Sequence, residues 1–354
     1  MPGYFSAMEK QGFEELLFAH DASTGLKAVI AIHSTILGPA LGGTRMWPYP
    51  TEEAAVNDVM RLARGMTYKA AMADRDLGGG KAVIIGDPCR DKSEKLLRAY
   101  GRFVDKLGGR YITAEDMGIG EKDLDWVRQE TAHVLGDSSQ GSPSPFTAYG
   151  VWRGIKASAR DALGSDSLEG LTVAVQGLGG VGSRLCEYLA GEGARLIVAD
   201  LDPEKVKGAV SRWAAKAVAP EEIHARECDI FAPCAAGGII NELTIPQLKC
   251  RIVAGAANNV LQDRACGAGL MNRGILYAPD YVINAGGLIY VDSIRLGLKD
   301  PDEIRRVVGR IEQRLTHIFK RSAAEKQPPE VVADLMAEER LQSGAKAAPT
   351  ETWA

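Results

Sequence analysis

A glycine-rich turn between a strand pattern and a helix pattern constrains this chain more than any other feature. Residues 171–176 are apolar and rich in β-branched side chains, and Gly177-Leu-Gly-Gly-Val-Gly182 follows them directly. A helical periodicity over 183–192 leads to a second apolar run, 195–199, which is followed by Asp200. This order of strand, GxGxxG turn, helix, strand and acidic residue is typical of the first βαβ unit of a dinucleotide-binding domain.

Each residue of this turn has a physical role in that interpretation. Gly177 permits the tight turn, Gly179 lets the backbone approach a pyrophosphate, and Gly182 lets the helix pack closely on the strand. The helix N-terminus offers free N–H groups and a partial positive charge to the phosphates. Asp200 would accept hydrogen bonds from the adenosine ribose, and Asp202 beside it would repel a 2′-phosphate, so we expect NAD rather than NADP. The expected cofactor contacts are Gly177, Leu178, Gly179, Gly180, Val181, Gly182, Asp200 and Leu201.

The composition argues against several classes of protein. A length of 354 residues predicts two domains at about 150 residues each. The net charge of −4, with no long run of one sign, gives no support for a nucleic-acid partner or an anionic membrane surface. No stretch approaches the roughly 18 apolar residues of a membrane span, and the N-terminus lacks a signal-peptide pattern, so we expect a cytoplasmic protein. Six cysteines without a CxxC pair and five scattered histidines predict reduced thiols and no metal site.

Apolar strand patterns alternate with helical patterns, which predicts an α/β fold. The clearest break is the Gly-, Ser- and Pro-rich segment 137–145, which is typical of a linker or hinge. We expect strands at 26–32, 82–85, 171–176, 195–199, 230–232, 251–254 and 275–278, and helices at 51–63, 93–107, 147–163, 303–320 and 330–341.

A second concentration of glycine surrounds two lysines in the first half of the chain. It comprises residues 38–45, 65–69 and 77–81, the last with three consecutive glycines before Lys81. Such glycines let a small substrate and a cofactor ring approach the main chain. Lys81, at the entry to an apolar strand and near a second cation such as Lys69, should have a lowered pKa and act as a base. The other lysine would suit a substrate carboxylate.

Asp116 adds a carboxylate at the end of an apolar run, a favoured active-site location in α/β folds. Taken singly, these residues have structural alternatives: Lys69 could end a helix, Lys81 could lie in an exposed turn, and Asp116 could cap a helix. Their occurrence together with a nucleotide-binding pattern favours a catalytic site.

Eight longer motifs extend these observations, at 39–47, 65–69, 77–81, 112–116, 143–150, 230–235, 254–259 and 278–287. Together they resemble the glutamate/leucine/phenylalanine/valine dehydrogenase family over about residues 10–340, most closely its leucine-using branch. The resemblance implies a reversible, NAD-dependent oxidative deamination of an aliphatic branched-chain L-amino acid (leucine, also isoleucine and valine) to the 2-keto acid and ammonium.

The resemblance also implies two domains that flank a cleft. The N-terminal α/β domain, 1–140, would bind substrate and oligomerise, completed by a C-terminal helix that returns over 328–354. A Rossmann-type NAD-binding domain would span 146–327. The cleft would close about hinges near 137–147 and 320–330. Members of the family form homo-oligomers, from dimers to octamers.

Motif matching assigns roles to individual residues. Lys81 would activate water, Asp116 would exchange a proton with the substrate nitrogen, and Lys69 would bind the substrate carboxylate near the backbone of Gly42 and Gly43. Met66 is implied on the substrate side. Thr147 and Asn258 would position the nicotinamide, and Asn284 would line the cofactor cleft. Additional cofactor contacts are implied for Cys234, Ala235 and Ala256.

Four residues would form the pocket for the substrate side chain: Leu41, Ala114, Leu288 and Val291. Family members that use glutamate carry a lysine in place of Leu41 and a serine in place of Val291, so glutamate is disfavoured here. Leu288 is larger than the valine of the leucine-using branch and would trim the pocket towards valine or 2-aminobutyrate. Aromatic-using relatives share the Gly-Gly-Leu-Ile stretch found here at 286–289, so a phenylalanine- or tryptophan-type substrate is an alternative. Ordinary core packing of these four residues is another.

Alternatives of a different class stay open from the residues alone. One is a catalytically silent NAD-binding sensor with the same fold. Another is an NAD enzyme with a cysteine nucleophile, of the aldehyde dehydrogenase kind, for which Cys228 and Cys234 lie nearest the nucleotide domain. A glycine-rich turn that binds no ligand is the remaining interpretation of residues 177–182.

Overall fold

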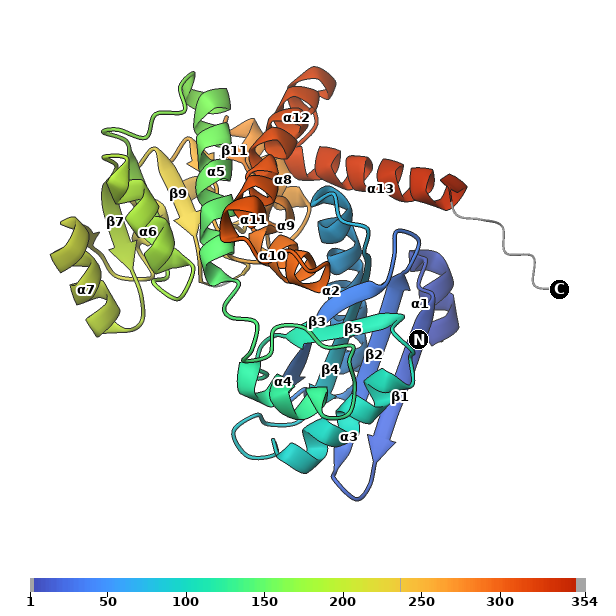
Figure 1. Cartoon of the computed structure of the whole chain (residues 1–354). Coiled ribbons are helices and arrows are strands. Elements are labelled where there is room, and N and C mark those ends of the chain that lie inside the picture. The colour runs from blue at the N-terminus through green and yellow to red at the C-terminus, as the bar shows by residue number, and fades with distance from the viewer. Residues whose placement is uncertain (1–2, 236, 348–354) are drawn as a thin grey trace. The chain divides into compact units, whose positions relative to one another are not determined.

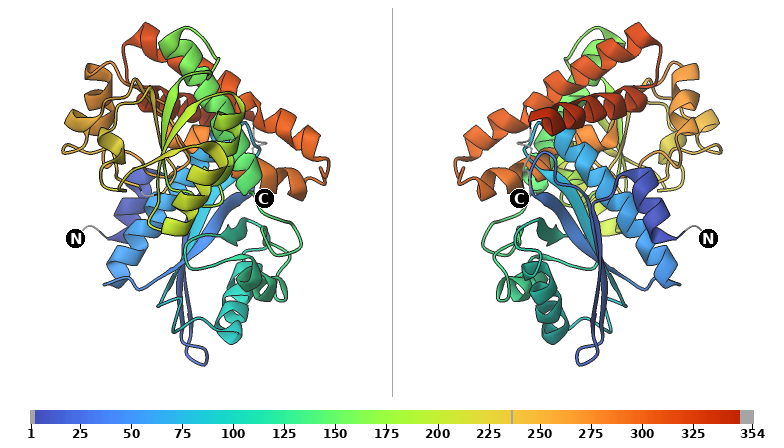
Figure 2. Two further views of the ribbon diagram at one scale, coloured as in Figure 1. Left: turned by 90° about the vertical axis from the view of Figure 1, so that its left-hand side faces the viewer. Right: turned by 90° about the vertical axis from the view of Figure 1, so that its right-hand side faces the viewer.

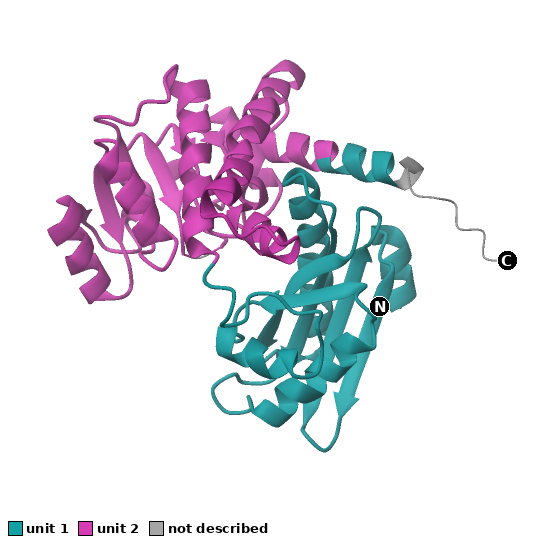
Figure 3. Cartoon of the chain, viewed as in Figure 1, with its two compact units in different colours: residues 1–142, 337–354 teal, residues 143–336 magenta. Residues whose placement is uncertain are grey.

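The computed structural model describes residues 3–235 and 237–347 and divides into two compact units. The first unit comprises residues 1–142 and 337–354, and the second comprises residues 143–336 (Figure 3). Each unit has its own β-sheet with helices packed on it, which confirms the predicted α/β class.

The first unit is built on a five-stranded sheet with the strand order β1-β2-β4-β3-β5. Strands β1, β2 and β4 pair antiparallel, whereas β3 pairs parallel with both β4 and β5. Helices α1 and α2 lie on one face, and α3 and α4 lie on the other (Figures 1 and 2). The elements are α1 (Tyr4–Gln11), β1 (Glu15–Asp21), β2 (Leu26–Ser34), β3 (Ala40–Trp47), α2 (Glu52–Met72), β4 (Gly78–Ile85), α3 (Glu94–Asp105), β5 (Tyr111–Glu115) and α4 (Glu121–Arg128).

Side-chain alternation along β4 assigns each residue to one face of this sheet. Val83 packs in one apolar cluster with Val56 of α2, whereas its neighbour Ile84 packs in another with Leu97 of α3. Lys81 lies two residues before Val83 and therefore faces α2. The alternation thus directs a charged side chain into the layer between sheet and helix.

The three consecutive glycines form the first half of β4, which begins earlier than predicted, at Gly78. A Cβ atom on Gly79 would lie 2.1 Å from the backbone nitrogen of Thr67 in α2, and one on Gly80 would lie 2.7 Å from the ring of Tyr111. At these two glycines the protein's own atoms occupy the space that the sequence pattern assigned to a ligand. The close approach of α2 to β4 requires Gly79, and the ring of Tyr111 from β5 requires Gly80.

The second unit contains a six-stranded sheet with the order β11-β10-β9-β6-β7-β8, and all of its pairs are parallel. Numbered from β6, this is the order 3-2-1-4-5-6 of the dinucleotide-binding fold, so the predicted Rossmann type is confirmed. The strands are β6 (Thr172–Gln176), β7 (Arg195–Ala199), β8 (Lys216–Ala217), β9 (Ile230–Pro233), β10 (Ile252–Val253) and β11 (Leu276–Tyr277).

The helices of the second unit begin with α5 (Ser144–Leu163), directly after the Gly-, Ser- and Pro-rich segment. Helix α6 follows the glycine-rich turn, and α10 to α12 pack with α5. The remaining bounds are α6 (Gly182–Gly191), α7 (Pro203–Trp213), α8 (Ala265–Asn272), α9 (Asp280–Ile283), α10 (Gly286–Arg295), α11 (Pro301–Val308), α12 (Arg310–Glu325) and α13 (Pro329–Ala347), with 3₁₀ turns at Ile223–Ala225 and Ile245–Gln247.

Three helices differ from the prediction. Helix α2, predicted over 51–63, continues to Met72. The single helix expected over 303–320 is divided at Gly309 into α11 and α12. Val308 and Ile311, on either side of the break, both pack near Gly150 of α5, so the apolar pattern continues although the helix does not. Helix α13 extends beyond the predicted 341, and the two units divide inside it, between residues 336 and 337. The predicted C-terminal return also includes residues 348–354, which lie outside the described residues.

No helix within the two described ranges is both long and apolar enough to cross a bilayer. Across the same ranges, no group of three or more His, Cys, Asp or Glu side chains is arranged to hold a metal ion. All six cysteines are free thiols.

The approach of α2 to β4 generates a stability prediction. Gly79→Ala forces a methyl group against the backbone of Thr67 and should lower the free energy of unfolding by about 1–3 kcal/mol. Gly65→Ala is the matched control, because a Cβ atom at this exposed position of α2 has no neighbour within 4 Å. It should leave stability unchanged or raise it by up to about 1 kcal/mol. Thermal unfolding compares the two, and equal melting temperatures would contradict the packing described.

Candidate active site

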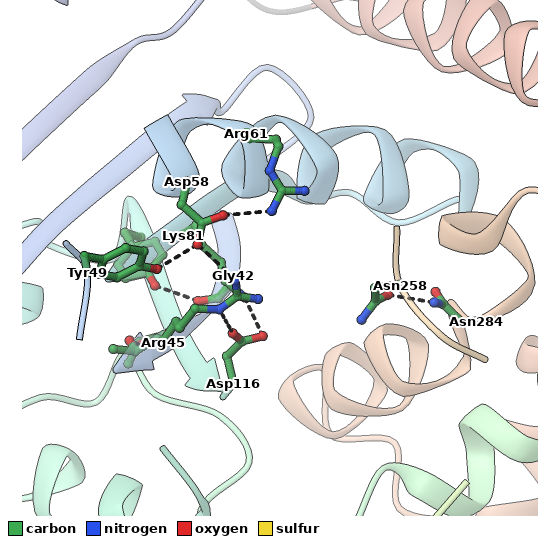
Figure 4. Close-up of polar contacts among 12 residues, drawn as sticks. Gly42, Arg45, Tyr49, Asp58, Arg61, Lys81, Asp116, Asn258 and Asn284 are labelled. Atoms are coloured by element: carbon green, nitrogen blue, oxygen red, sulfur yellow. Dashed lines mark hydrogen bonds and ion pairs between the residues drawn. The ribbon is translucent and has the colours of Figure 1, made fainter. Parts of the chain in front are cut away.

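A buried ion pair between Lys81 and Asp116 is the centre of the candidate site in the first unit. Nζ of Lys81 lies 2.9 Å from Oδ1 of Asp116, and Lys81 is only 5% exposed (Figure 4). Because β3 runs between β4 and β5, the pair crosses over β3 at Gly43. A Cβ atom on Gly43 would lie 2.1 Å from the carbonyl oxygen of Glu115 and 3.1 Å from Cβ of Asp116. The arrangement therefore requires glycine at position 43.

A second carboxylate, Asp58 of α2, is connected to the pair through Arg45 of β3. Nε of Arg45 donates to Oδ2 of Asp116 at 2.7 Å, and Nη1 donates to Oδ2 of Asp58 at 2.9 Å (Figure 4). The hydroxyl of Tyr49 donates to the same Asp58 oxygen at 2.7 Å. Nη2 of Arg61 donates to the other oxygen, Oδ1, at 2.8 Å. Charges of alternating sign thus run from Arg61 at the surface to the buried lysine.

The sequence pattern alone does not single out Arg45, Tyr49 or Asp58. A usable signal exists for Arg45, which lies two residues after Gly43 on one strand and therefore on the same face. No comparable signal exists for Asp58. A charged residue in a surface helix usually faces solvent, so the burial of Asp58 is a tertiary effect.

The pKa of Lys81 is lowered, as predicted, but the second cation involved is Arg45 rather than Lys69. Burial is the main cause, and the Arg45 charge acts in the same direction, while Asp116 and Asp58 oppose it. Burial would raise the pKa of Asp116, but the charges of Lys81 and Arg45 outweigh it and lower that pKa to about 2. The site thus keeps an ionised carboxylate beside a lysine that loses its proton more readily than usual.

Other residues predicted on the substrate side belong to α2, β3 and β5 of the first unit. Met66 and Lys69 lie one turn apart on α2, both partly exposed. The Cγ atom of Met66 is 3.3 Å from where a Cβ atom on Gly42 would lie. The carbonyl oxygen of Gly42 accepts a hydrogen bond from the Tyr111 hydroxyl at 2.6 Å. Of the predicted pocket residues in this unit, Leu41 is buried and Ala114 is partly exposed.

The glycine-rich turn of the second unit has the geometry that a dinucleotide site needs. Gly177 has φ +97°, in the left-handed region. A Cβ atom on Gly182 would lie 2.0 Å from the carbonyl oxygen of Gly177. A Cβ atom on Gly179, by contrast, would have no neighbour within 4 Å. The protein itself requires glycine at positions 177 and 182, whereas the open space at Gly179 fits the approach of a pyrophosphate.

Asp200 closes the turn from the end of β7. Its Oδ2 accepts the backbone N–H of Leu178 at 2.6 Å, and its Oδ1 accepts that of Asp202 at 2.9 Å. Burial opposes ionisation, but these two hydrogen bonds prevail and lower the pKa of Asp200. Gly180 and Leu201 are exposed, Leu201 at 91%, and Val181 is partly exposed.

The remaining predicted cofactor residues follow parallel strands of the second unit. Cys234 and Ala235 come after β9, and a Cβ atom on Gly177 would lie 2.7 Å from the Cβ of Ala235. Asn258 follows β10 and accepts a hydrogen bond from Nδ2 of the buried Asn284 at 2.7 Å (Figure 4). Nδ2 of Asn284 also donates to the carbonyl oxygen of Ala256 at 3.1 Å. Asn284 follows helix α9, whereas the other residues lie beyond the carboxyl ends of strands, where ligands of this fold bind.

Thr147 and the other pocket residues belong to two helices of the second unit. The hydroxyl of Thr147, on α5, donates to the Pro143 carbonyl oxygen at 3.2 Å, and a Cβ atom on Gly287 would lie 2.8 Å from the Thr147 hydroxyl. On α10, Leu288 is buried and Val291 is partly exposed.

The cysteines of the second unit do not fit a nucleophile. Burial raises the pKa of Cys186, Cys228 and Cys234 to about 12, and that of Cys250 to about 11. A catalytic cysteine needs a lowered pKa to form its thiolate. The burial of these thiols therefore does not favour the cysteine-nucleophile alternative.

Two family models match the chain. One, described as the Glu/Leu/Phe/Val dehydrogenase dimerisation domain, matches residues 15–133. The other, described as glutamate/leucine/phenylalanine/valine dehydrogenase, matches residues 200–337.

Individual proteins give the same result. The chain is 55% identical over 350 residues to a leucine dehydrogenase of Geobacillus stearothermophilus, covering 97% of this chain and 94% of that one. It superimposes on the crystal structure of L-tryptophan dehydrogenase from Nostoc punctiforme with a TM-score of 0.87 at 46% identity, covering 97% and 100% of the two chains. A hetero-hexameric glutamate dehydrogenase of Thermus thermophilus, in a leucine-bound form, matches with a TM-score of 0.76 at 25% identity, covering 94% and 88%.

The Asp116 ion pairs predict a pH dependence of stability. Because the pKa of Asp116 falls from about 3.8 in the unfolded chain to about 2, its charged form stabilises the fold above pH 4. That contribution, about 2 kcal/mol, is lost as the pH falls from about 4 to 2. Urea unfolding between pH 5 and 2.5 should show a steeper loss of stability for the wild type than for Asp116→Asn. Asp105→Asn, which removes an exposed carboxylate of the same unit, controls for the change in net charge; parallel curves for wild type and Asp116→Asn would contradict the account.

Proposed function

The chain belongs to the glutamate/leucine/phenylalanine/valine dehydrogenase family, and we propose that within it the protein is an NAD-dependent leucine dehydrogenase. It would convert leucine, isoleucine and valine reversibly to their 2-keto acids and ammonium. The observation that carries the proposal is the buried Lys81–Asp116 pair, which supplies a base and an ionised carboxylate for amine chemistry. Identity of 55% to a leucine dehydrogenase supports the choice of substrate.

The proposed roles follow the order of the reaction. The carboxylate of Asp116 takes a proton from the substrate amino group, and a bound nicotinamide would accept the hydride from the substrate Cα. Neutral Lys81 then takes a proton from a water molecule as its oxygen attacks the imine carbon. Asp116 returns its proton to the carbinolamine nitrogen, which leaves as ammonia while the ionised Asp116 takes the hydroxyl proton, and the 2-keto acid forms. The protons then held by Asp116 and Lys81 pass to ammonia and to solvent. Burial of Lys81 supports this role, because a lowered pKa supplies the neutral base.

Substrate and cofactor binding are assigned to groups within each unit. In the first, Lys69 would bind the substrate carboxylate, with Met66 and the backbone of Gly42 and Gly43 beside it. In the second, the turn 177–182 would bind the pyrophosphate, Thr147 and Asn258 would position the nicotinamide, and Asn284 would line the cofactor cleft. Further cofactor contacts would come from Cys234, Ala235 and Ala256. Both carboxylate oxygens of Asp200 already accept backbone N–H groups, which leaves lone pairs for ribose hydroxyls. An ionised Asp200 supports NAD over NADP, since a 2′-phosphate would be repelled.

The side-chain pocket would consist of Leu41, Ala114, Leu288 and Val291. None of these can pair with a γ-carboxylate, so glutamate would leave a charge without a partner. A tryptophan-type substrate is the second candidate, favoured by the likeness to L-tryptophan dehydrogenase. The higher identity to a leucine dehydrogenase favours the aliphatic choice.

We also propose a homo-oligomer in a reducing, cytoplasmic setting. The match of residues 15–133 to a dimerisation domain supports assembly, as does the hexameric glutamate dehydrogenase among the similar structures. Six free cysteines, of which Cys89 is exposed, support a reducing compartment.

The deciding experiment measures NADH or NADPH formation with seven L-amino acids: leucine, isoleucine, valine, 2-aminobutyrate, phenylalanine, tryptophan and glutamate. Turnover with the aliphatic members and NAD, and little with NADP, is the expected outcome. A preference for phenylalanine or tryptophan would keep the chemistry and overturn the proposed pocket. Tight NADH binding without turnover of any amino acid would favour a silent sensor.

Lys81→Met tests the proposed base. It should lower kcat by about 10²–10⁴-fold, because neutral methionine cannot take a proton from water. Asp116 keeps its contact with Arg45, so the variant should fold, and NADH affinity measured by fluorescence titration should be unchanged. Lys95→Met, at an exposed position of the same unit, is the control. Near-normal turnover by folded Lys81→Met would refute the assignment.

A further inference from the structure

Arg45 contacts two carboxylates with two different nitrogens. Its Nε is 2.7 Å from Asp116 and its Nη1 is 2.9 Å from Asp58. The guanidinium is planar and its donors are fixed relative to one another, so binding to Asp58 determines where Nε points. A lysine ammonium, a single point charge on a flexible stem, would not fix that direction.

Asp116 is held in turn by both of its oxygens. Oδ2 accepts from Arg45, and Oδ1 lies 2.9 Å from Nζ of Lys81. With Oδ2 occupied by Arg45, Oδ1 remains directed at the lysine. Asp116 is the first residue after β5, where the side chain would otherwise be free to rotate toward solvent.

Asp58 anchors the other end of this chain of contacts. The hydroxyl of Tyr49 donates to its Oδ2 and Arg61 donates to its Oδ1. Burial and the Asp58 charge raise the pKa of Tyr49 well above its ordinary value, so the phenol stays a neutral donor. The pKa of Asp58 is lowered although burial opposes this, because Tyr49, Arg61 and Arg45 all favour the ionised form.

We propose that Arg45 and Asp58 are positioning residues: Arg45 aims Asp116 at Lys81, and the opposite charges of Arg45 and Asp58 set the protonation state that Lys81 brings to the reaction. The assignment rests on the proposed function for its chemical meaning. Neither residue needs to contact the substrate.

The signs of the two effects are opposite. The charged groups that face Lys81 are Arg45 from β3, Asp116 from the end of β5, and Asp58 from α2. Lys69, also on α2, and Glu115, at the end of β5, belong to the surrounding elements and stay unchanged in the variants below. Removing the Arg45 charge removes a repulsion and should raise the pKa of Lys81. Removing the Asp58 charge removes an attraction and should lower it.

The test compares Arg45→Gln and Asp58→Asn in the full chain by two measurements. The first follows the Lys81 side chain directly, by the ¹³Cε resonance of labelled lysine across pH, assigned by its loss in Lys81→Met. The second is the pH profile of kcat/KM for leucine. In both measurements, Arg45→Gln should raise the pKa of Lys81 and Asp58→Asn should lower it, each by about half a pH unit or more.

Two further variants separate positioning from charge. Arg45→Lys keeps the charge, so the pKa of Lys81 should stay within about 0.2 pH unit of its wild-type value. Its kcat should fall about tenfold, because one ammonium cannot hold both carboxylates in the same geometry. Arg90→Gln, which removes an 82% exposed arginine of the same unit, should change neither quantity.

The two measurements distinguish the possible failures. Opposite shifts in the resonance with no turnover of any amino acid would support the proposed effect of Arg45 and Asp58 on Lys81 and overturn the proposed function. Shifts of the same sign, or no shifts, in an active enzyme would overturn the proposed effect of Arg45 and Asp58 on Lys81 and leave the proposed function intact. A purely structural role would lower the melting temperature of both variants without moving the Lys81 titration in opposite directions.

Discussion

The burial of one ammonium group governs the arrangement of the first unit. Moving a lysine charge out of water costs several kcal/mol unless a partner compensates it, and Lys81 is 5% exposed. Asp116 is that partner, and it can reach the lysine only because Gly43 leaves the surface of β3 free. Asp116 is stabilised in turn by Arg45, and Arg45 by Asp58. Gly43, Asp116, Arg45 and Asp58 thus form one set of contacts that compensates a single buried charge.

The glycine-rich turn of the second unit meets a different requirement, which is to let a bulky anion come close to backbone N–H groups. Gly177 and Gly182 satisfy the packing of the turn itself, and Gly179 leaves an open space. Asp200 tightens the turn through two backbone hydrogen bonds. The same fingerprint therefore contains two kinds of glycine, those that the protein needs and one that a ligand would need.

Local pattern was sufficient to predict the second unit, because strand β6, the turn and helix α6 are consecutive in the chain. The motifs also singled out Lys81 and Asp116, which form an ion pair in the structure. Local pattern failed where contacts join distant segments. The glycines at 78–80 resemble a loop by composition, and only the closeness of Thr67 and Tyr111 explains why they form a strand. Asp58 resembles a surface residue until Arg45 and Tyr49 are placed against it. Gly309 divides a helix whose apolar periodicity continues, so periodicity alone could not locate the break.

The contact between Gly79 and Thr67 has a mechanical consequence. At Gly79 the strand and the helix are so close that they cannot slide past each other without a clash between Thr67 and the strand backbone. Lys81 lies two residues beyond Gly79 on the strand, and Lys69 lies two residues beyond Thr67 on the helix. The two lysines are therefore parts of one rigid body. Their spacing is preorganised when the chain folds, and binding an amino acid in this unit would require side chains to turn but no backbone element to shift.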